Sequence, residues 1–271
     1  MDRHMLLKWS DQEVWLKVPK LIDHGSVQTE DKAHSIQYLI YEYLGQSLYE
    51  YFEQLLNSTN AIQGKARMTE QLIQTMSQLH QLGFIHRDVK PDNFMVQDNE
   101  VYLIDFGCVT EFNLENFEKE KTWYPVGTPL TQSKFVMNGF YSCQGDDLIS
   151  TLYSILFLQD PDSLSWVNDC INAKQLNIAS LNKIRDQKEK LTANQKYCDE
   201  SSKVIINQIK LLESLRVEDP DKFTKDINYN AIIEAVKLSY KIEQDAFDYN
   251  SRQSSLSIRS LDNLSLRLKQ N

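Results

Sequence analysis

The chain has 271 residues, and its 29 Lys and Arg against 38 Asp and Glu give a formal net charge of -9. Hydrophobic residues make up 41% and charged residues 25%, which are values of a folded globular protein and exclude disorder of the whole chain. An acidic surface repels phosphates, which argues against broad binding to nucleic acid or to anionic membranes. Apolar stretches such as 152–158 are too short to span a bilayer, so we expect neither a membrane span nor a signal peptide.

The first predicted elements mix strand and helix. A β-rich run at 36–44 ends at Gly45, and helical signals follow at 47–56. The next helix is predicted from an N-cap at Thr69 to a stop at Gly83, because Leu, Ile and Met recur between them at three- and four-residue spacing.

Two short strands are predicted next, at 94–96 and 101–104, with Asp98 and Asn99 as the turn between them. Residues 147–158 are apolar on nearly all sides, which indicates a buried helix. Further amphipathic helices are expected near 166–173, 178–190, 199–215 and 229–242.

The stretch 250–271 differs in composition, since it holds six serines and four basic residues. This composition predicts a mobile tail, while apolar residues at helical spacing leave a docked helix as an alternative. The serines could also be sites of autophosphorylation, although a disordered linker is the simpler interpretation.

The four cysteines, at positions 108, 143, 170 and 198, form no CxxC pair. The five histidines do not combine with them at the spacing of metal ligands. We therefore expect reduced thiols rather than a zinc site or a disulfide framework.

Residues with catalytic chemistry are concentrated in one segment. Residues 84–96 read FIHRDVKPDNFMV, and Asp105-Phe106-Gly107 follows a short distance later. These match the HRDxKPxN catalytic loop and the DFG motif of protein kinases. Two motifs in the right order and spacing make an accidental match unlikely, so the chain resembles the protein kinase superfamily.

The chemistry of phosphoryl transfer explains why these residue types are needed, because it depends on positioning and charge neutralisation. Asp88 can accept the proton of an attacking hydroxyl, and the charge of Lys90 can reach the transferring γ-phosphate. Asn93 offers an amide oxygen to a metal ion, and Asp105 offers a carboxylate that can bridge Mg²⁺ to the phosphates.

Other segments narrow the resemblance to the casein kinase 1 family. The run from Gly127-Thr128 to Asp146-Asp147 is similar to that family's GTxxYxS and DDLES segments, and the resemblance covers about residues 9–242. It implies an α+β, protein-kinase-like fold with a truncated small N-lobe and a mainly helical C-lobe. The implied division is 1–44 for a partial N-lobe with the first helix and the hinge-side strands, 45–249 for the C-lobe and 250–271 for a flexible tail.

The resemblance also implies a role for individual residues. Asp88 would be the catalytic base, with Lys90 and Thr128 assisting at the substrate hydroxyl. Asn93 and Asp105 would hold Mg²⁺. The remaining roles are hinge contacts to adenine from Glu42 and Leu44, a gatekeeper at Tyr41, an anchor for the catalytic loop at Asp147, and the glutamate of the first helix at Glu13.

The pattern departs from a full kinase at the N-lobe. A kinase has a glycine-rich hairpin over the ATP phosphates and a strand lysine paired with a helix glutamate. No GxGxxG occurs here, and Lys8 stands only five residues before Glu13, so we interpret Lys8 as a surface charge. Two interpretations stay open: an active kinase truncated at its N-terminus, or a natural protein that lacks most of its upper lobe.

Another departure concerns substrate choice. Leu130 stands where the family has the arginine of GTAR, and Gln144-Gly145 replace an arginine pair. Bidentate contacts to phosphate are lost without these guanidinium groups, so a preference for phosphorylated substrates does not carry over.

We expect a casein-kinase-1-like kinase that uses ATP and Mg²⁺ to phosphorylate Ser or Thr of protein substrates. The alternative is a catalytically impaired pseudokinase that acts as a binding scaffold. A monomer without a nucleic-acid partner is expected, in the cytoplasm or alternatively in the nucleus.

Overall fold

The structure is a computed structural model that describes residues 16–29, 34–113, 126–172, 177–192 and 199–268, with side chains up to residue 250 except that of residue 172. Glu13 and Lys8 lie outside the described residues. The strands are β1 (Leu21–Gln28), β2 (Ser35–Tyr41), β3 (Gln46–Ser47), β4 (Phe84–Ile85), β5 (Phe94–Gln97), β6 (Glu100–Leu103) and β7 (Thr110–Glu111). The α-helices are α2 (Leu48–Leu56), α3 (Ala61–Gln81), α5 (Lys134–Met137), α6 (Gln144–Gln159), α7 (Val167–Asn172), α8 (Ile178–Glu189), α9 (Glu200–Glu218), α10 (Pro220–Thr224) and α11 (Tyr229–Leu268). Two 3-10 turns, η1 (Pro91–Asn93) and η2 (Pro161–Ser163), complete the described elements.

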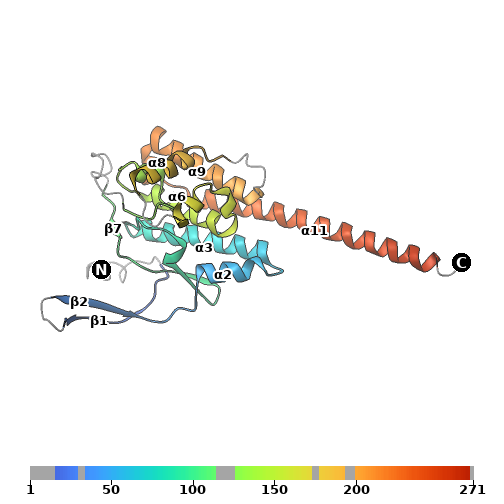
Figure 1. Cartoon of the computed structure of the whole chain (residues 1–271), viewed down its shortest axis with the longest axis horizontal. Helices are drawn as coiled ribbons and strands as arrows, with labels where there is room; N and C mark the ends of the chain where they lie inside the picture. The colour runs from blue at the N-terminus through green and yellow to red at the C-terminus, as the bar shows by residue number, and fades with distance from the viewer. Residues whose placement is uncertain (1–15, 30–33, 114–125, 173–176, 193–198, 269–271) are drawn as a thin grey trace.

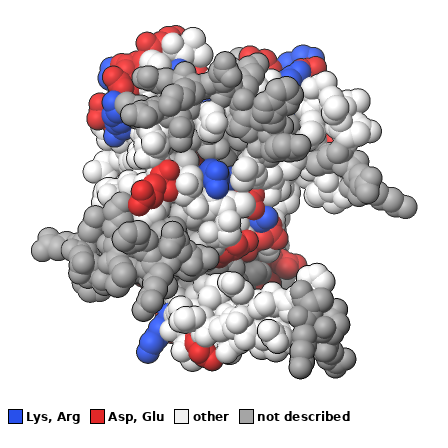
Figure 2. All heavy atoms as spheres, turned by 90° about the vertical axis from the view of Figure 1, so that its left-hand side faces the viewer, with Lys and Arg blue, Asp and Glu red and all other residues white. Residues whose placement is uncertain are grey.

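The β1–β2 hairpin projects from one end of a helical body (Figure 1). Its strands pair antiparallel with each other and with no other described strand. Apolar side chains of both strands are exposed, among them Ile22, Val27 and Ile36. Figure 2, which views the molecule from this side, shows the hairpin as a largely uncharged protrusion below the body. A two-stranded hairpin buries little apolar surface, so its own contacts stabilise it only marginally.

The core of the body is built around α6, whose residues are buried on almost every side. Tyr153 of α6 packs edge-on against Trp166, with ring centroids 5.2 Å apart. Helices α3 and α9 pack against α6, and α11 lies along α3 and α9. The far part of α11 extends away from the body (Figure 1). The prediction of a buried helix at 147–158 is confirmed.

Two small sheets carry the loops that matter for chemistry. β3, β5 and β6 form one antiparallel sheet, and β4 pairs antiparallel with β7 in the other. Asp98 and Asn99 form the β5–β6 turn, both with positive φ (53° and 61°), which suits these residue types. The two strands and the turn predicted here are confirmed.

The predicted start of the long helix at Thr69 is wrong. Helix α3 begins at Ala61, because good helix formers such as Lys65 and Met68 continue the helix before Thr69. Thr69 is buried in the middle of α3, and its hydroxyl lies 3.0 Å from the Tyr240 hydroxyl of α11. The predicted stop is confirmed, since Gly83 follows α3 with a φ of 84°.

Helix α11 continues to residue 268, through the stretch for which the sequence predicted a tail. The mobility of that stretch stays a prediction. No helix in the described part of the chain combines the length and the apolar composition that crossing a bilayer requires.

Ser47 begins α2 with a capping box. Its hydroxyl accepts a hydrogen bond from the backbone N–H of Glu50 at 3.2 Å, and the Glu50 carboxylate accepts one from the backbone N–H of Ser47 at 2.8 Å. The variant Ser47→Ala should lower the free energy of unfolding by about 1 kcal/mol, measured by chemical denaturation. Ser58→Ala, just past the other end of α2, is the control and should change it by much less.

Candidate active site

The loop that holds the HRD sequence is anchored to helix α6 by Asp147. The buried Asp147 carboxylate accepts hydrogen bonds from the backbone N–H of His86 at 2.6 Å and of Arg87 at 2.8 Å. Its Oδ2 also lies 3.1 Å from His80 Nε2. Arg87 has a φ of 69°, a strained value for a residue with a side chain. These bonds hold the loop in a conformation that it would not adopt alone.

His80 is a site-supporting residue that sequence reasoning missed. It lies in α3, is buried, and also contacts the Tyr229 hydroxyl at 2.5 Å through Nδ1. Its position on the buried side of a helix is the only signal in the sequence, and that signal is also typical of ordinary core residues.

The Asp88 carboxylate lies where two other predicted site residues converge. Lys90 Nζ donates to its Oδ2 at 2.9 Å, and Thr128 Oγ1 donates to its Oδ1 at 2.7 Å. Lys90 Nζ is also 3.3 Å from Thr128 Oγ1, and Asn93 Nδ2 donates to the Asp88 carbonyl at 2.8 Å. The structure therefore brings together four residues from two segments about 40 positions apart in sequence.

The environment of Lys90 favours its positively charged form. Partial burial lowers the pKa of its ammonium, but the hydrogen bond that it donates to Asp88 and the charges of Asp88, Asp92 and Asp105 outweigh this effect and raise the pKa. Lys90 therefore stays positive over the whole physiological pH range. A fixed positive charge beside Asp88 is suited to meet an anionic group such as a phosphate.

Asp105 leaves strand β6 beside the catalytic loop. The backbone N–H of Ile104 donates to the Asn93 carbonyl at 2.9 Å, which ties the strand end to the loop. Asp105 has a φ of 58°, and its Oδ1 accepts from the backbone N–H of Gly107 at 3.0 Å. On the far side, Arg87 Nε donates to the Cys108 carbonyl at 2.6 Å.

The donor set of the site fits a magnesium ion. The Asn93 amide nitrogen is bound to a backbone carbonyl, which leaves its amide oxygen as the group for a metal, and Asp105 offers an exposed carboxylate. No cluster of three or more His, Cys, Asp and Glu that could hold a metal ion was found among the described residues. Mg²⁺ usually takes one or two protein oxygens and completes its shell with phosphates and water.

The hinge-side residues follow strand β2. The backbone N–H of Glu42 donates to the Lys20 carbonyl at 2.9 Å, which ties this segment to the residues before β1. Leu44 is buried. Burial and the charge of Asp105 raise the pKa of Tyr41. The predicted adenine contacts stay a prediction.

Gly127 allows the segment carrying Thr128 to approach the catalytic loop. It has a φ of 117°, and a Cβ atom at this position would lie 2.6 Å from the Arg87 carbonyl oxygen. Gly127→Ala should therefore lower the free energy of unfolding by about 1–3 kcal/mol, measured by chemical denaturation. Gly139→Ala is the control, because Gly139 also has a positive φ (84°) but follows α5. Equal costs for the two variants would contradict a role for the close approach to Arg87.

A comparison of the sequence with known protein families identifies the class of protein that it resembles. Residues 16–130 match the family model described as protein kinase domain. The chain has a protein-kinase-like α+β fold, with a small sheet region and a mostly helical remainder. The predicted fold class and the resemblance to protein kinases are confirmed.

Two curated proteins that are similar to this chain carry protein kinase names. A probable serine/threonine-protein kinase of Dictyostelium discoideum is 32% identical over 127 residues, which cover 44% of this chain and 26% of the relative. A probable casein kinase I homolog of Encephalitozoon cuniculi is 25% identical over 182 residues, which cover 65% of this chain and 58% of the relative. The chain thus spans less than two thirds of the length of either relative.

Proposed function

We propose that the protein transfers the γ-phosphate of ATP to Ser or Thr hydroxyls of protein substrates, as a casein-kinase-1-like enzyme. The observation that carries the proposal is the Asp88 carboxylate, with Lys90 Nζ at 2.9 Å and Thr128 Oγ1 at 2.7 Å. A carboxylate held in this way can accept a hydroxyl proton and aim the hydroxyl oxygen.

Each side chain has a distinct task in this proposal. Asp88 orients the substrate hydroxyl and takes its proton, while Thr128 keeps the carboxylate in one orientation. Lys90 places its positive charge beside the phosphate being transferred. Asn93 and Asp105 would hold Mg²⁺, which when bound neutralises the negative charge of the phosphates.

The choice of Ser and Thr rests on similarity. Lys90 follows Asp88 by two residues, as in serine/threonine kinases, and both named relatives carry kinase names. Protein substrates follow from the same resemblance.

The test is transfer of labelled γ-phosphate by the full chain to a mixed protein substrate, followed by phosphoamino-acid analysis. We expect label on Ser or Thr, lost when EDTA removes Mg²⁺. Thermal unfolding with saturating Mg–ATP provides an independent measurement, and an increase in Tm is expected. Absence of both transfer and stabilisation would contradict the proposal and favour a binding scaffold.

A further inference from the structure

Lys188, near the end of α8, is completely buried although its side chain ends in an ammonium group. Its Nζ donates to the backbone carbonyls of Pro129 at 2.8 Å and of Leu130 at 3.2 Å, and also to that of Gln132. An ammonium group has three N–H donors, so the three carbonyls match its full donor capacity.

The partners of Lys188 offset part of the cost of burying its charge, without a carboxylate in contact. The ammonium nitrogen lies 4.7 Å from the centre of the Tyr153 ring and 5.2 Å from that of Trp166. Aromatic faces attract a cation more strongly when water is excluded. No ion pair of the described residues includes Lys188, so backbone carbonyls and aromatic rings are its partners.

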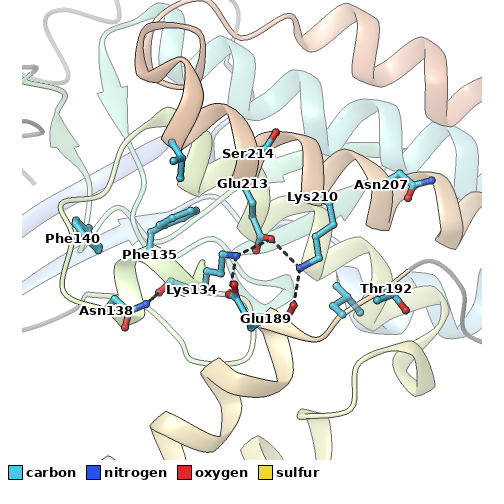
Figure 3. A pocket seen from close by; sticks show the side chains of 12 residues that line it. Lys134, Phe135, Asn138, Phe140, Glu189, Thr192, Asn207, Lys210, Glu213 and Ser214 are labelled. Carbon is cyan, nitrogen blue, oxygen red and sulfur yellow. Dashed lines mark hydrogen bonds and ion pairs between the residues drawn. The ribbon is translucent and has the colours of Figure 1, made fainter.

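The end of α8 that holds Lys188 is itself fixed. Lys210 Nζ donates to the carbonyls of Lys188 at 3.2 Å and of Glu189 at 3.4 Å. Glu213 lies between Lys210, at 2.9 Å, and Lys134, at 3.2 Å, as Figure 3 shows. Lys134 also contacts the Glu189 carboxylate at 2.8 Å. This network lines a cavity of about 840 Å³ and restrains the helix end from which Lys188 reaches the loop.

The other end of the same loop touches the candidate active site. Thr128, next to Pro129, donates to Asp88 Oδ1 at 2.7 Å. The backbone N–H groups of Thr131 and Gln132 donate to the Thr128 carbonyl at 3.1 and 2.9 Å. The segment 128–132 is thus a compact turn. Its first residue, Thr128, contacts Asp88, and the carbonyls that follow contact Lys188.

We propose that Lys188 is a positioning residue of the site: it holds the turn 128–132 by three of its carbonyls and so fixes Thr128 against Asp88. The Leu130 carbonyl also accepts from the Trp166 indole N–H at 2.9 Å, so without the ammonium group it is the Pro129 and Gln132 carbonyls that lose this partner. The turn would have to open toward water to replace it. The consequence for phosphoryl transfer rests on the proposed function, whereas the hold on the turn does not.

The pH dependence of this hold has a definite sign. Burial lowers the pKa of Lys188 to about 7, and the charge of Glu213 of α9 opposes the shift. The Cys170 thiol of α7 also faces Lys188, but it is neutral near this pH because burial raises its own pKa. Tyr153 of α6 stays neutral because burial raises its pKa well above its ordinary value. As pH rises through about 7, Lys188 loses its charge and one N–H donor. The turn should therefore open more often at higher pH.

Hydrogen exchange of backbone amides tests the proposal directly. In Lys188→Met, which keeps the length and removes the donors, peptides containing Thr131 and Gln132 should exchange roughly tenfold faster or more. Lys183→Met is the matched control, because Lys183 lies on the same helix, is exposed and contacts Asp169 at 2.6 Å. Its turn peptides should exchange as in the wild type. Unchanged exchange of the turn in Lys188→Met would overturn the proposal.

The wild-type protein provides a second measurement that requires no variant to fold. Exchange of the turn peptides, corrected for the intrinsic pH dependence, should increase relative to that of α6 peptides between about one pH unit below and one above the Lys188 pKa. A constant ratio would also overturn the proposal.

Steady-state kinetics then test whether the turn matters for phosphoryl transfer. Lys188→Met should lower kcat/KM for the protein substrate while leaving KM for ATP unchanged, and Lys183→Met should alter neither. If the wild type shows no transfer at all, the proposed function fails, while hydrogen exchange still decides whether Lys188 holds the turn.

Discussion

Asp88→Asn should lower kcat for phosphoryl transfer by a factor of about 100 to 10,000 without unfolding the protein. The asparagine has the same shape, and its amide oxygen can still accept the hydrogen bond from Thr128. It cannot take up the proton of the substrate hydroxyl. The measurement is kcat at saturating Mg–ATP and substrate.

A matched control is available in the same loop. Asp92 is exposed, and its carboxylate lies 3.4 Å from the Tyr49 hydroxyl rather than beside Thr128. Asp92→Asn should keep kcat within about twofold of the wild type, because Lys90 keeps its ion pair with Asp88 at 2.9 Å and Asp92 makes no hydrogen bond to Asp88 or Thr128.

Asp105→Asn separates proton transfer from metal binding. This variant loses a carboxylate ligand for Mg²⁺, so it should lose both transfer and the rise in Tm caused by Mg–ATP. Asp88→Asn should lose transfer but keep the rise in Tm. Transfer that survives either substitution at the wild-type rate would show that the site is assigned wrongly.

The second large expected effect is a loss of stability when Asp147 is replaced. Asp147→Ala should lower the free energy of unfolding by about 3 kcal/mol or more, because the N–H groups of His86 and Arg87 would be left buried without an acceptor. Urea denaturation measures the change.

Asp162→Asn is the control for Asp147, since Asp162 is exposed in η2. It should change the free energy of unfolding by less than about 0.5 kcal/mol. If Asp147→Ala were as stable as Asp162→Asn, the catalytic loop would not depend on its anchor in α6.

Features encoded by neighbouring residues could be predicted from the sequence. The turn at Asp98 and Asn99 and the helix stop at Gly83 depend on the backbone preferences of those residues, and the structure confirms both. The catalytic loop and the Asp105 segment could be located because their residue types recur at fixed spacing. The catalytic loop precedes β5 and Asp105 follows β6, so the antiparallel pairing of these two strands brings the two segments together.

Features that depend on distant partners could not be predicted. Threonine is a residue type that favours N-caps, but the Thr69 hydroxyl is hydrogen-bonded to that of Tyr240, which lies 171 positions later. Lys188 binds backbone carbonyls of residues 56 to 59 positions earlier, and a carbonyl has no signature in a sequence. A lysine within an amphipathic helix is normally solvated, so the sequence gives no sign that Lys188 is buried.

Strand β1 was missed for a similar reason. Its sequence, LIDHGSVQ, lacks a regular alternation of apolar and polar residues, and its conformation depends on pairing with β2. The hinge-side end of β2 was easier to predict, since its residues are rich in β-branched and aromatic types.

The uncovered hairpin has a practical consequence for handling the protein. Neither outer edge of the β1–β2 ribbon pairs with another described strand, and exposed Ile and Val side chains lie beside these edges. Such edges recruit strands from other molecules, so concentrated solutions should self-associate through this ribbon and dilute ones should not. Light scattering across a dilution series would measure this self-association as an apparent mass that rises with concentration.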